Sequence, residues 1–224
     1  MILSKIACTA CGGTMRVQEG ETLATCGYCG NQFAVHMDSP DFTIDRGMLI
    51  KYNGGSREVE VPLGVRAIGT LAFYGQHTIT KIVLPEGVEE LQGVLNCNGL
   101  ETLILPASLK HIPSAAFSDC VSLTKIVLPS ELRNIGNLAF CNCKSLTEIE
   151  LPATLPSVEK MVFYNCHALT TITLYAETKL IGDFYVGCES LQTLRVLDNW
   201  SDNLVAVKTL ALGTDGCHYE VTSD

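Results

Sequence analysis

The sequence predicts a mainly β protein in which a parallel β-solenoid of repeats about 23 residues long follows a small domain built around four cysteines. Two observations predict this fold class. From Val59 onward an apolar strand motif returns at a nearly fixed spacing. A period in the low twenties is typical of a solenoid, whose stacked coils bury one continuous core. Before the repeats, two pairs of closely spaced cysteines lie within residues 1–37.

The N-terminal segment carries its cysteines as Cys8-x2-Cys11 and Cys26-x2-Cys29. Two thiolates on one tight turn can point at one ion, and two such turns complete a tetrahedron of sulfurs about 2.3 Å from zinc. Glycines after each pair permit the positive φ of such turns. Residues 14–18, 23–25 and 31–35 are expected to be strands. The pattern predicts a zinc ribbon over residues 1–37 and resembles the ribbons that begin many bacterial proteins.

The predicted zinc is structural, because four protein thiolates leave no open position for water or substrate. A segment of this size buries too little surface to fold alone, whereas zinc can supply about 10–16 kcal/mol of folding free energy. Two disulfides, or iron in a rubredoxin-like site, are the alternatives for these cysteines.

Residues 38–58 are expected to connect the ribbon to the repeats and to cap them. Short strands are predicted at residues 42–44 and 48–52, and Asn53-Gly54-Gly55 is a turn signal. The repeats are predicted over residues 59–197. Residues 198–224 lose the pattern and are expected to cap the open end, which would otherwise expose core and strand edges.

The repeat that begins at Ile126 shows how one coil is expected to fold. Ile126 and Leu128 alternate inward on a strand that Pro129 ends, and Gly136 turns the chain. The other inward positions of this repeat are Leu132, Ile135, Ala139, Phe140, Cys143 and Leu146.

Two positions of the repeat form ladders along the predicted core. The aromatic ladder consists of Phe73, Phe117, Phe140, Phe163 and Tyr185, with Leu95 in place of a ring in one repeat; the cysteine ladder consists of Cys97, Cys120, Cys143, Cys166 and Cys188, with Gln76 in the first repeat. Because cysteine is a small and frequently buried residue, the second ladder is expected to be core. Cys141 is the candidate for an accessible thiol.

The recurring order I-x-L-P, I-G, A-F-x-x-C and L-x-x-I resembles the BspA-like leucine-rich repeat family over about residues 42–197. The resemblance implies a leucine-rich-repeat solenoid. It also implies binding as the general role, since many members of that family are bacterial surface proteins that bind host or matrix partners. Here the N-terminus carries a thiolate site and no secretory signal pattern, so a cytoplasmic protein is expected instead of a surface adhesin.

Outward strand positions form the candidate binding surface, because side chains alternate across a strand. The outward side chains form an apolar stripe next to a strand that carries two glutamates. Exposed apolar patches often mark interaction sites. The alternative is that valine and isoleucine stand there simply as good strand formers. We expect a protein or peptide partner. The partner-binding candidates are Lys81, Val83, Thr102, Ile104, Lys125, Val127, Glu148 and Glu150.

Composition and residue spacing argue against several other classes of function. A formal net charge of −9 disfavours nucleic acid as the main partner. The sequence holds no apolar run near the roughly 18 residues of a membrane helix, and no nucleophile–base spacing or phosphate loop of an enzyme. Eleven cysteines, an odd number, suit a reducing compartment. Two alternatives stay open: a regulatory protein whose ribbon contacts nucleic acid or the transcription machinery, and a thiol-based sensor using Cys141 or the ladder.

Overall fold

The structure, a computed structural model, describes residues 2–8, 11–18, 23–34, 40–92, 97–197 and 204–209. Within these ranges every element of regular secondary structure is a β-strand, which confirms the predicted fold class. A search of the described residues finds no helix that could cross a membrane. The predicted Leu95 position lies outside them.

Two antiparallel strand pairs form the N-terminal ribbon. Three of its strands were predicted, whereas β1, which pairs with β2, was not. None of the four strands contacts a described strand of the solenoid. Their bounds are β1 (Ile2–Ala7), β2 (Thr14–Gln18), β3 (Leu23–Thr25) and β4 (Gln32–Ala34).

The hairpin of β5 (Phe42–Asp45) and β6 (Met48–Tyr52) begins the solenoid. It falls in the segment predicted as a connector, and both its strands were predicted. β6 also pairs in parallel with the first coil, and Leu49 and Tyr52 are fully buried. The hairpin therefore forms the first layer of the core and covers the end of the first coil.

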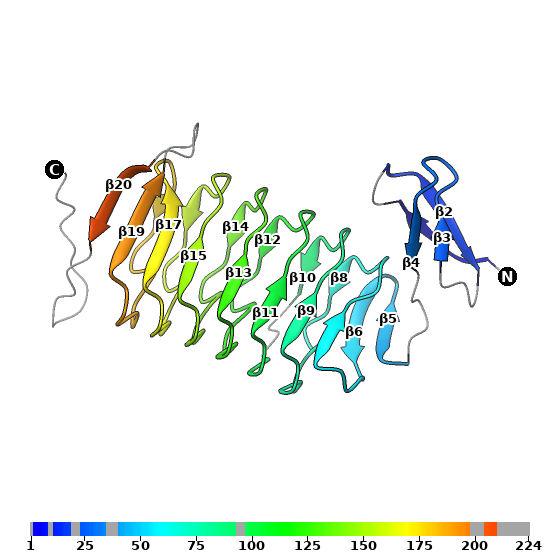
Figure 1. Cartoon of the computed structure of the whole chain (residues 1–224), viewed down its shortest axis with the longest axis horizontal. Helices are drawn as coiled ribbons and strands as arrows, with labels where there is room; N and C mark the ends of the chain where they lie inside the picture. Colours follow the sequence, from blue (N-terminus) through cyan, green and yellow to red (C-terminus); the bar gives the residue numbers. More distant parts are fainter. Residues whose placement is uncertain are drawn as a thin grey trace.

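One strand of each coil lies on a broad front surface (Figure 1). Within its sheets the strands are parallel and in register, with each strand one repeat after its neighbour. The last strand, β20 (Leu204–Thr209), turns back antiparallel on β19 and covers its edge. The front strands are β7 (Glu58–Glu60), β9 (Lys81–Val83), β11 (Thr102–Ile104), β13 (Lys125–Val127), β15 (Glu148–Glu150), β17 (Thr171–Tyr175) and β19 (Thr193–Leu197).

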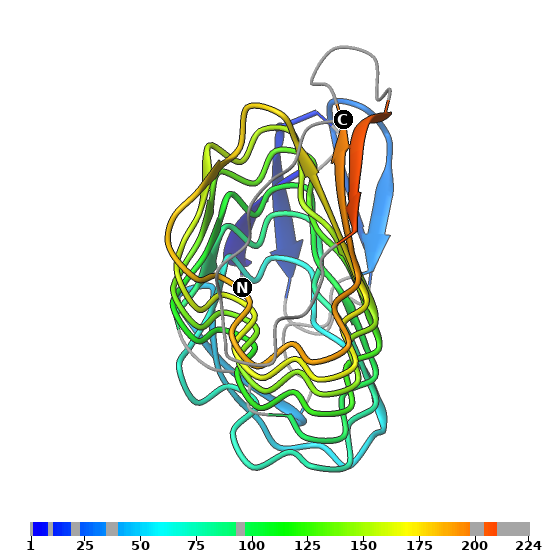
Figure 2. The same ribbon diagram turned by 90° about the vertical axis from the view of Figure 1, so that its left-hand side faces the viewer.

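A second set of two-residue strands lies on the opposite side of each coil. Figure 2 looks along the stack and shows the coils superimposed as flattened loops. Gly136 follows one back strand, and a Cβ there would come within 2.5 Å of the Ser114 backbone nitrogen, so close approach of the coils requires glycine. The back strands are β8 (Ala67–Ile68), β10 (Glu90–Leu91), β12 (His111–Ile112), β14 (Asn134–Ile135), β16 (Ser157–Val158) and β18 (Lys179–Leu180).

The core lies between the front and back strands and runs the length of the stack. All inward positions predicted for the Ile126 repeat are buried. In the aromatic ladder, Phe140 lies 5.3 Å from Phe117 and 5.5 Å from Phe163 between ring centroids. At the last step Phe184 is buried, whereas the predicted Tyr185 is half-buried and packs edge-on against it.

Hydrogen bonding between coils is interrupted at one junction on both sides of the stack. β13 and β15 are neighbours in space but belong to different sheets, and so do β14 and β16 behind them. The segment that follows each back strand forms a third side of the coil. Across the same junction this third side stays bonded, since Phe140 N–H donates to Val162 O at 2.9 Å and Asn142 N–H donates to Tyr164 O at 2.8 Å. We call this junction, between the repeats that begin at Ile126 and Ile149, the seam.

Proline removes one backbone donor of the back strands at the seam. The residue before β10 and the residue before β14 each donate a backbone N–H to the preceding coil: Glu89 to Arg66 O at 2.9 Å and Arg133 to Lys110 O at 2.8 Å. The equivalent residue before β16 is Pro156, which has no N–H. That bond cannot form across the seam.

Candidate metal centre and binding face

The two cysteine turns of the ribbon have the same backbone structure. In the first, Cys8 N–H donates to Gly13 O and Gly12 N–H donates to Cys8 O, both at 2.7 Å. In the second, Cys26 N–H donates to Asn31 O and Gly30 N–H donates to Cys26 O, both at 2.9 Å. Both turns are therefore closed by the bonds that the predicted knuckles need.

Glycine is required at the same place in each turn. Gly12 has φ 72° and Gly30 has φ 75°, which is the left-handed region that only glycine enters at no steric cost. The glycine that follows each predicted cysteine pair thus serves the turn itself.

The four predicted ligands meet at one point. Cys8 Sγ lies 3.5 Å from Cys29 Sγ, and Cys11 Sγ lies 3.6 Å from Cys26 Sγ. All four sulfurs lie within 4.8 Å of one another. A tetrahedron of sulfurs at about 2.3 Å from zinc has edges of about 3.8 Å, so the arrangement fits a tetrahedral ion. None of the described cysteines is disulfide-bonded.

The electrostatics of the cluster favour a bound cation. The backbone N–H groups of Cys29 and Tyr28 hydrogen-bond to the Cys26 sulfur and lower its pKa to about 6. The backbone N–H of Gly13 acts in the same direction on Cys11, but the three neighbouring sulfurs outweigh it and raise the Cys11 pKa to about 12. Four crowded sulfurs cannot all become thiolates without a positive charge between them, and a metal ion supplies that charge.

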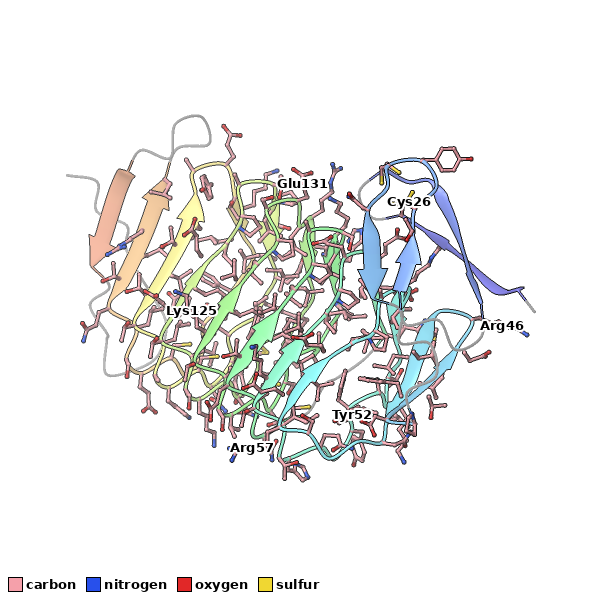
Figure 3. All side chains as sticks on the ribbon, turned by 45° about the vertical axis from the view of Figure 1, so that its right-hand side comes forward. Cys26, Arg46, Tyr52, Arg57, Lys125 and Glu131 are labelled. Carbon is pink, nitrogen blue, oxygen red and sulfur yellow. The ribbon has the colours of Figure 1, made fainter. Side chains whose placement is uncertain are left out.

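The cluster has a buried and an exposed side. Cys8 and Cys26 are buried, whereas Cys11 and Cys29 are exposed. Figure 3 labels Cys26, and sulfur atoms gather beside it at the end of the ribbon. Four such thiolates can coordinate a thiophilic ion tightly. They would fill all four positions of a tetrahedral ion and leave none open for water or substrate.

The predicted binding residues lie on the front strands and face outward. Thr102, Lys125, Glu148 and Glu150 are exposed, and Lys81 and Val83 are half-buried. Ile104 and Val127 are 46% and 70% exposed. The inward residues between them are buried, as alternation requires. Lys125 is labelled on this surface in Figure 3.

Two residues of the same surface were not predicted. Glu58 and Glu60 on β7 are exposed and are in register with Lys81 and Val83 on β9. Glu58 Oε2 lies 3.2 Å from Lys81 Nζ. The signal was present in the sequence, because both glutamates stand 23 residues before their partners, as the repeat requires.

The cysteine ladder is core, as predicted. All five of its members are buried. Burial raises the pKa of Cys97 to about 12 and that of Cys120 to about 11, so these are neutral thiols at physiological pH. Cys141 is half-buried, and its pKa is also raised by burial, which does not favour a reactive thiolate.

Comparisons with known proteins agree with this fold. The family model of the BspA type leucine-rich repeat region matches six copies over residues 51–137 and 94–203. A leucine-rich repeat protein of T. pallidum is 30% identical, with a TM-score of 0.60, over 70% of this chain and 77% of that chain. A search of the curated proteins finds no significant match.

Two further solved structures share the fold at lower identity. A leucine-rich repeat protein from Bacteroides ovatus is 22% identical, with a TM-score of 0.55, over 89% of this chain and 50% of that one. The pneumococcal vaccine antigen PcpA is 20% identical, with a TM-score of 0.57, over 81% of this chain and 44% of that one. This chain therefore spans half or less of these two proteins.

The matched repeats cover the stack from the end of β6 to beyond β19, and they carry the aromatic and cysteine ladders described above. The ribbon lies outside the matched residues. The chain belongs to the BspA-type leucine-rich repeat family.

Proposed function

We propose that the solenoid is a protein-interaction module that binds a protein or peptide partner through the outward side chains of its front strands. Leucine-rich repeat proteins generally bind proteins, and an exposed apolar patch is the usual mark of such a site. The observation that carries the proposal is the row of Val83, Ile104 and Val127, in which two neighbouring side chains are 46% and 70% exposed. The proposed role is binding and not catalysis.

The size of the front surface limits what it can bind. Seven strands about 4.8 Å apart, each about four residues long at about 3.3 Å per residue, give roughly 440 Å². A standard interface buries about 800 Å² on each partner. The strands alone therefore suit a peptide segment, and a tight protein partner would also contact the loops.

We also propose that Cys8, Cys11, Cys26 and Cys29 hold a structural zinc ion. The equivalent turns, the sulfur spacing and the crowding of thiols support this proposal. Zinc is preferred because it suits a closed site of four thiolates. The division of the chain at residues 1–37, 38–58, 59–197 and 198–224 is part of the same proposal.

A reducing compartment, and hence the cytoplasm, is the proposed location. The ten described cysteines are all free thiols. In an oxidising environment, exposed Cys11 and Cys29 would be open to disulfide formation.

Capture of a partner by immobilised full-length chain tests the main proposal. The double variant Ile104→Asp with Val127→Asp places two charges in the apolar row. We expect it to capture about tenfold less partner than the wild type, because it is costly to remove water from a carboxylate that faces an apolar contact. Leu71→Asp is the matched control, since Leu71 is 61% exposed and lies outside the front strands. Equal capture by the double variant and the control would contradict the front surface as the binding site.

A further inference from the structure

We propose that the front surface recognises an extended polypeptide segment with an apolar centre and one basic side chain at each end. This inference rests on the proposed function and specifies the chemistry of the partner. It follows from the order of side chains in one row across the strands, from their charges and from the spacing of the strands.

The row runs perpendicular to the strands and is apolar in the middle. Glu60, Val83, Ile104 and Val127 are in Cα register across β7, β9, β11 and β13. Glu150 holds the equivalent place on the neighbouring strand β15, 23 residues after Val127. Three apolar side chains are therefore bracketed by two exposed glutamates.

The two glutamates of this row have no cation of the chain beside them. Among the described residues, neither Glu60 nor Glu150 forms an ion pair, whereas Glu58 in the adjacent row is paired with Lys81 at 3.2 Å. Lys125 lies in that adjacent row as well, on the strand next to Glu148. From Glu60 to Glu150 the row thus offers two unpaired negative charges, which a partner with two positive charges would complement; the nearest cation in line with them, Arg195, stands two strands beyond Glu150.

Strand spacing sets the length of the segment. Glu60 and Glu150 lie four strand intervals apart, which is about 19 Å at about 4.8 Å each. An extended segment covers that distance with about six residues at about 3.3 Å each. The basic side chains should therefore flank a short apolar stretch.

Recognition has to use side chains. β9 and β11 are hydrogen-bonded to a neighbouring strand on both sides, so their backbone groups have no free edge for an added strand. The partner's specificity then depends on apolar contact at the centre and on charge at the two ends.

Selection from a random dodecapeptide library, with the full chain immobilised, is the first test. We expect the enriched peptides to carry an apolar centre between two arginine or lysine residues about six positions apart. A synthetic enriched peptide is then titrated against variants. Glu60→Gln with Glu150→Gln should weaken its binding about tenfold, since an exposed ion pair accounts for a few-fold each, and added salt should reduce this difference.

Three comparisons make the outcome decisive. Glu177→Gln, an exposed glutamate outside the row, should leave the affinity unchanged. Glu60→Lys with Glu150→Lys should select peptides with acidic ends. If the selected peptides have neutral or acidic ends and their binding still depends on Val127, the proposed basic ends of the partner are wrong and the proposed function stands. If no peptide depends on Val127 or Ile104, both proposals fail.

Discussion

At the scale of single residues, the cysteine ladder shows why one residue type recurs inside the stack. Four of the five ladder thiols, those of Cys97, Cys143, Cys166 and Cys188, donate to a carbonyl oxygen of the preceding coil, for example Cys143 to Phe117 O at 3.3 Å and Cys166 to Phe140 O at 3.0 Å. Each of these carbonyls already accepts one backbone N–H from its own coil. Cysteine thus combines a small apolar volume with a weak donor for the second lone pair, and alanine would supply only the volume.

The raised thiol pKa values predict loss of stability in alkali. In the folded protein Cys120 has a pKa of about 11, above its ordinary value of 9.0, because it is buried. Below pH 9 both states keep the proton, so the contribution of the thiol is fully present. As the pH rises from 9 through 11, only the unfolded thiol ionises, and each buried thiol lowers the free energy of unfolding by up to about 1.4 kcal/mol per pH unit.

Chemical denaturation at a series of pH values between these limits measures the effect. Cys120→Ala should be less stable than wild type at neutral pH but should lose less stability as the pH rises. The half-buried Cys141 provides the control variant Cys141→Ala, which should change the slope less. An unchanged slope in Cys120→Ala would contradict the assignment of this thiol as neutral and buried.

At the scale of elements, the seam is the one junction between the described front strands at which their hydrogen bonding is interrupted; the back strands are also interrupted between β10 and β12. Front and back hydrogen bonding are both interrupted there, and the coils are held by the third side and by the contact between Phe140 and Phe163. Thr154 adds to this contact, because its hydroxyl lies 2.6 Å from Leu132 O and 2.8 Å from Ser130 O. Local opening is expected where hydrogen bonds between elements are missing.

Pro156→Arg should strengthen the seam. Pro156 is exposed, so its replacement removes no core contact. Arginine stands at the equivalent position 133 of the preceding coil. The new N–H at position 156 can donate to Arg133 O. A bond of this kind contributes about 0.5–1.5 kcal/mol. Hydrogen exchange should therefore become slower at the amides of β16. Pro152→Arg is the matched control, because the same position is proline in the three preceding coils, as Pro85, Pro106 and Pro129. Equal slowing in the control would attribute the effect to proline loss and not to the restored bond.

At the scale of the whole molecule, the repeat made most of the fold predictable. Once Ile126 and its equivalents were aligned, alternation and period assigned the inward positions of that coil correctly. The period alone could not show that the hairpin of β5 and β6 joins the back strands, because an antiparallel hairpin does not carry the repeat. It also could not show the seam, since one missing N–H at Pro156 becomes visible only when two coils are placed side by side. Glu58 and Glu60 fit the period and lie in the first repeat, just before Val61-Pro62, so the same period could have placed them on the front surface.

The described molecule has two parts, a ribbon that carries the four-cysteine cluster and a stack of repeats. Among the residues whose burial is described, the main buried cluster runs from Leu49 to Leu194 and includes none of the ribbon. No ribbon strand contacts a described solenoid strand. Energetic coupling between the two parts should therefore be small, and the ribbon should depend on its ion, since zinc binding supplies about 10–16 kcal/mol to comparable small domains.

Metal analysis and chelation of the full chain test this organisation together. We expect one zinc per chain, and loss of that zinc from Cys11→Ser with Cys29→Ser but not from Cys141→Ser, because only the first two residues belong to the sulfur cluster. Removal of zinc should expose the ribbon to protease while the denaturation midpoint of the solenoid stays the same. A midpoint that falls with the zinc would show that the ribbon stabilises the stack as a cap. Unchanged protease resistance after complete removal of zinc would show instead that the ribbon folds without its ion. We do not expect this outcome, because a segment of this size buries too little surface to fold alone.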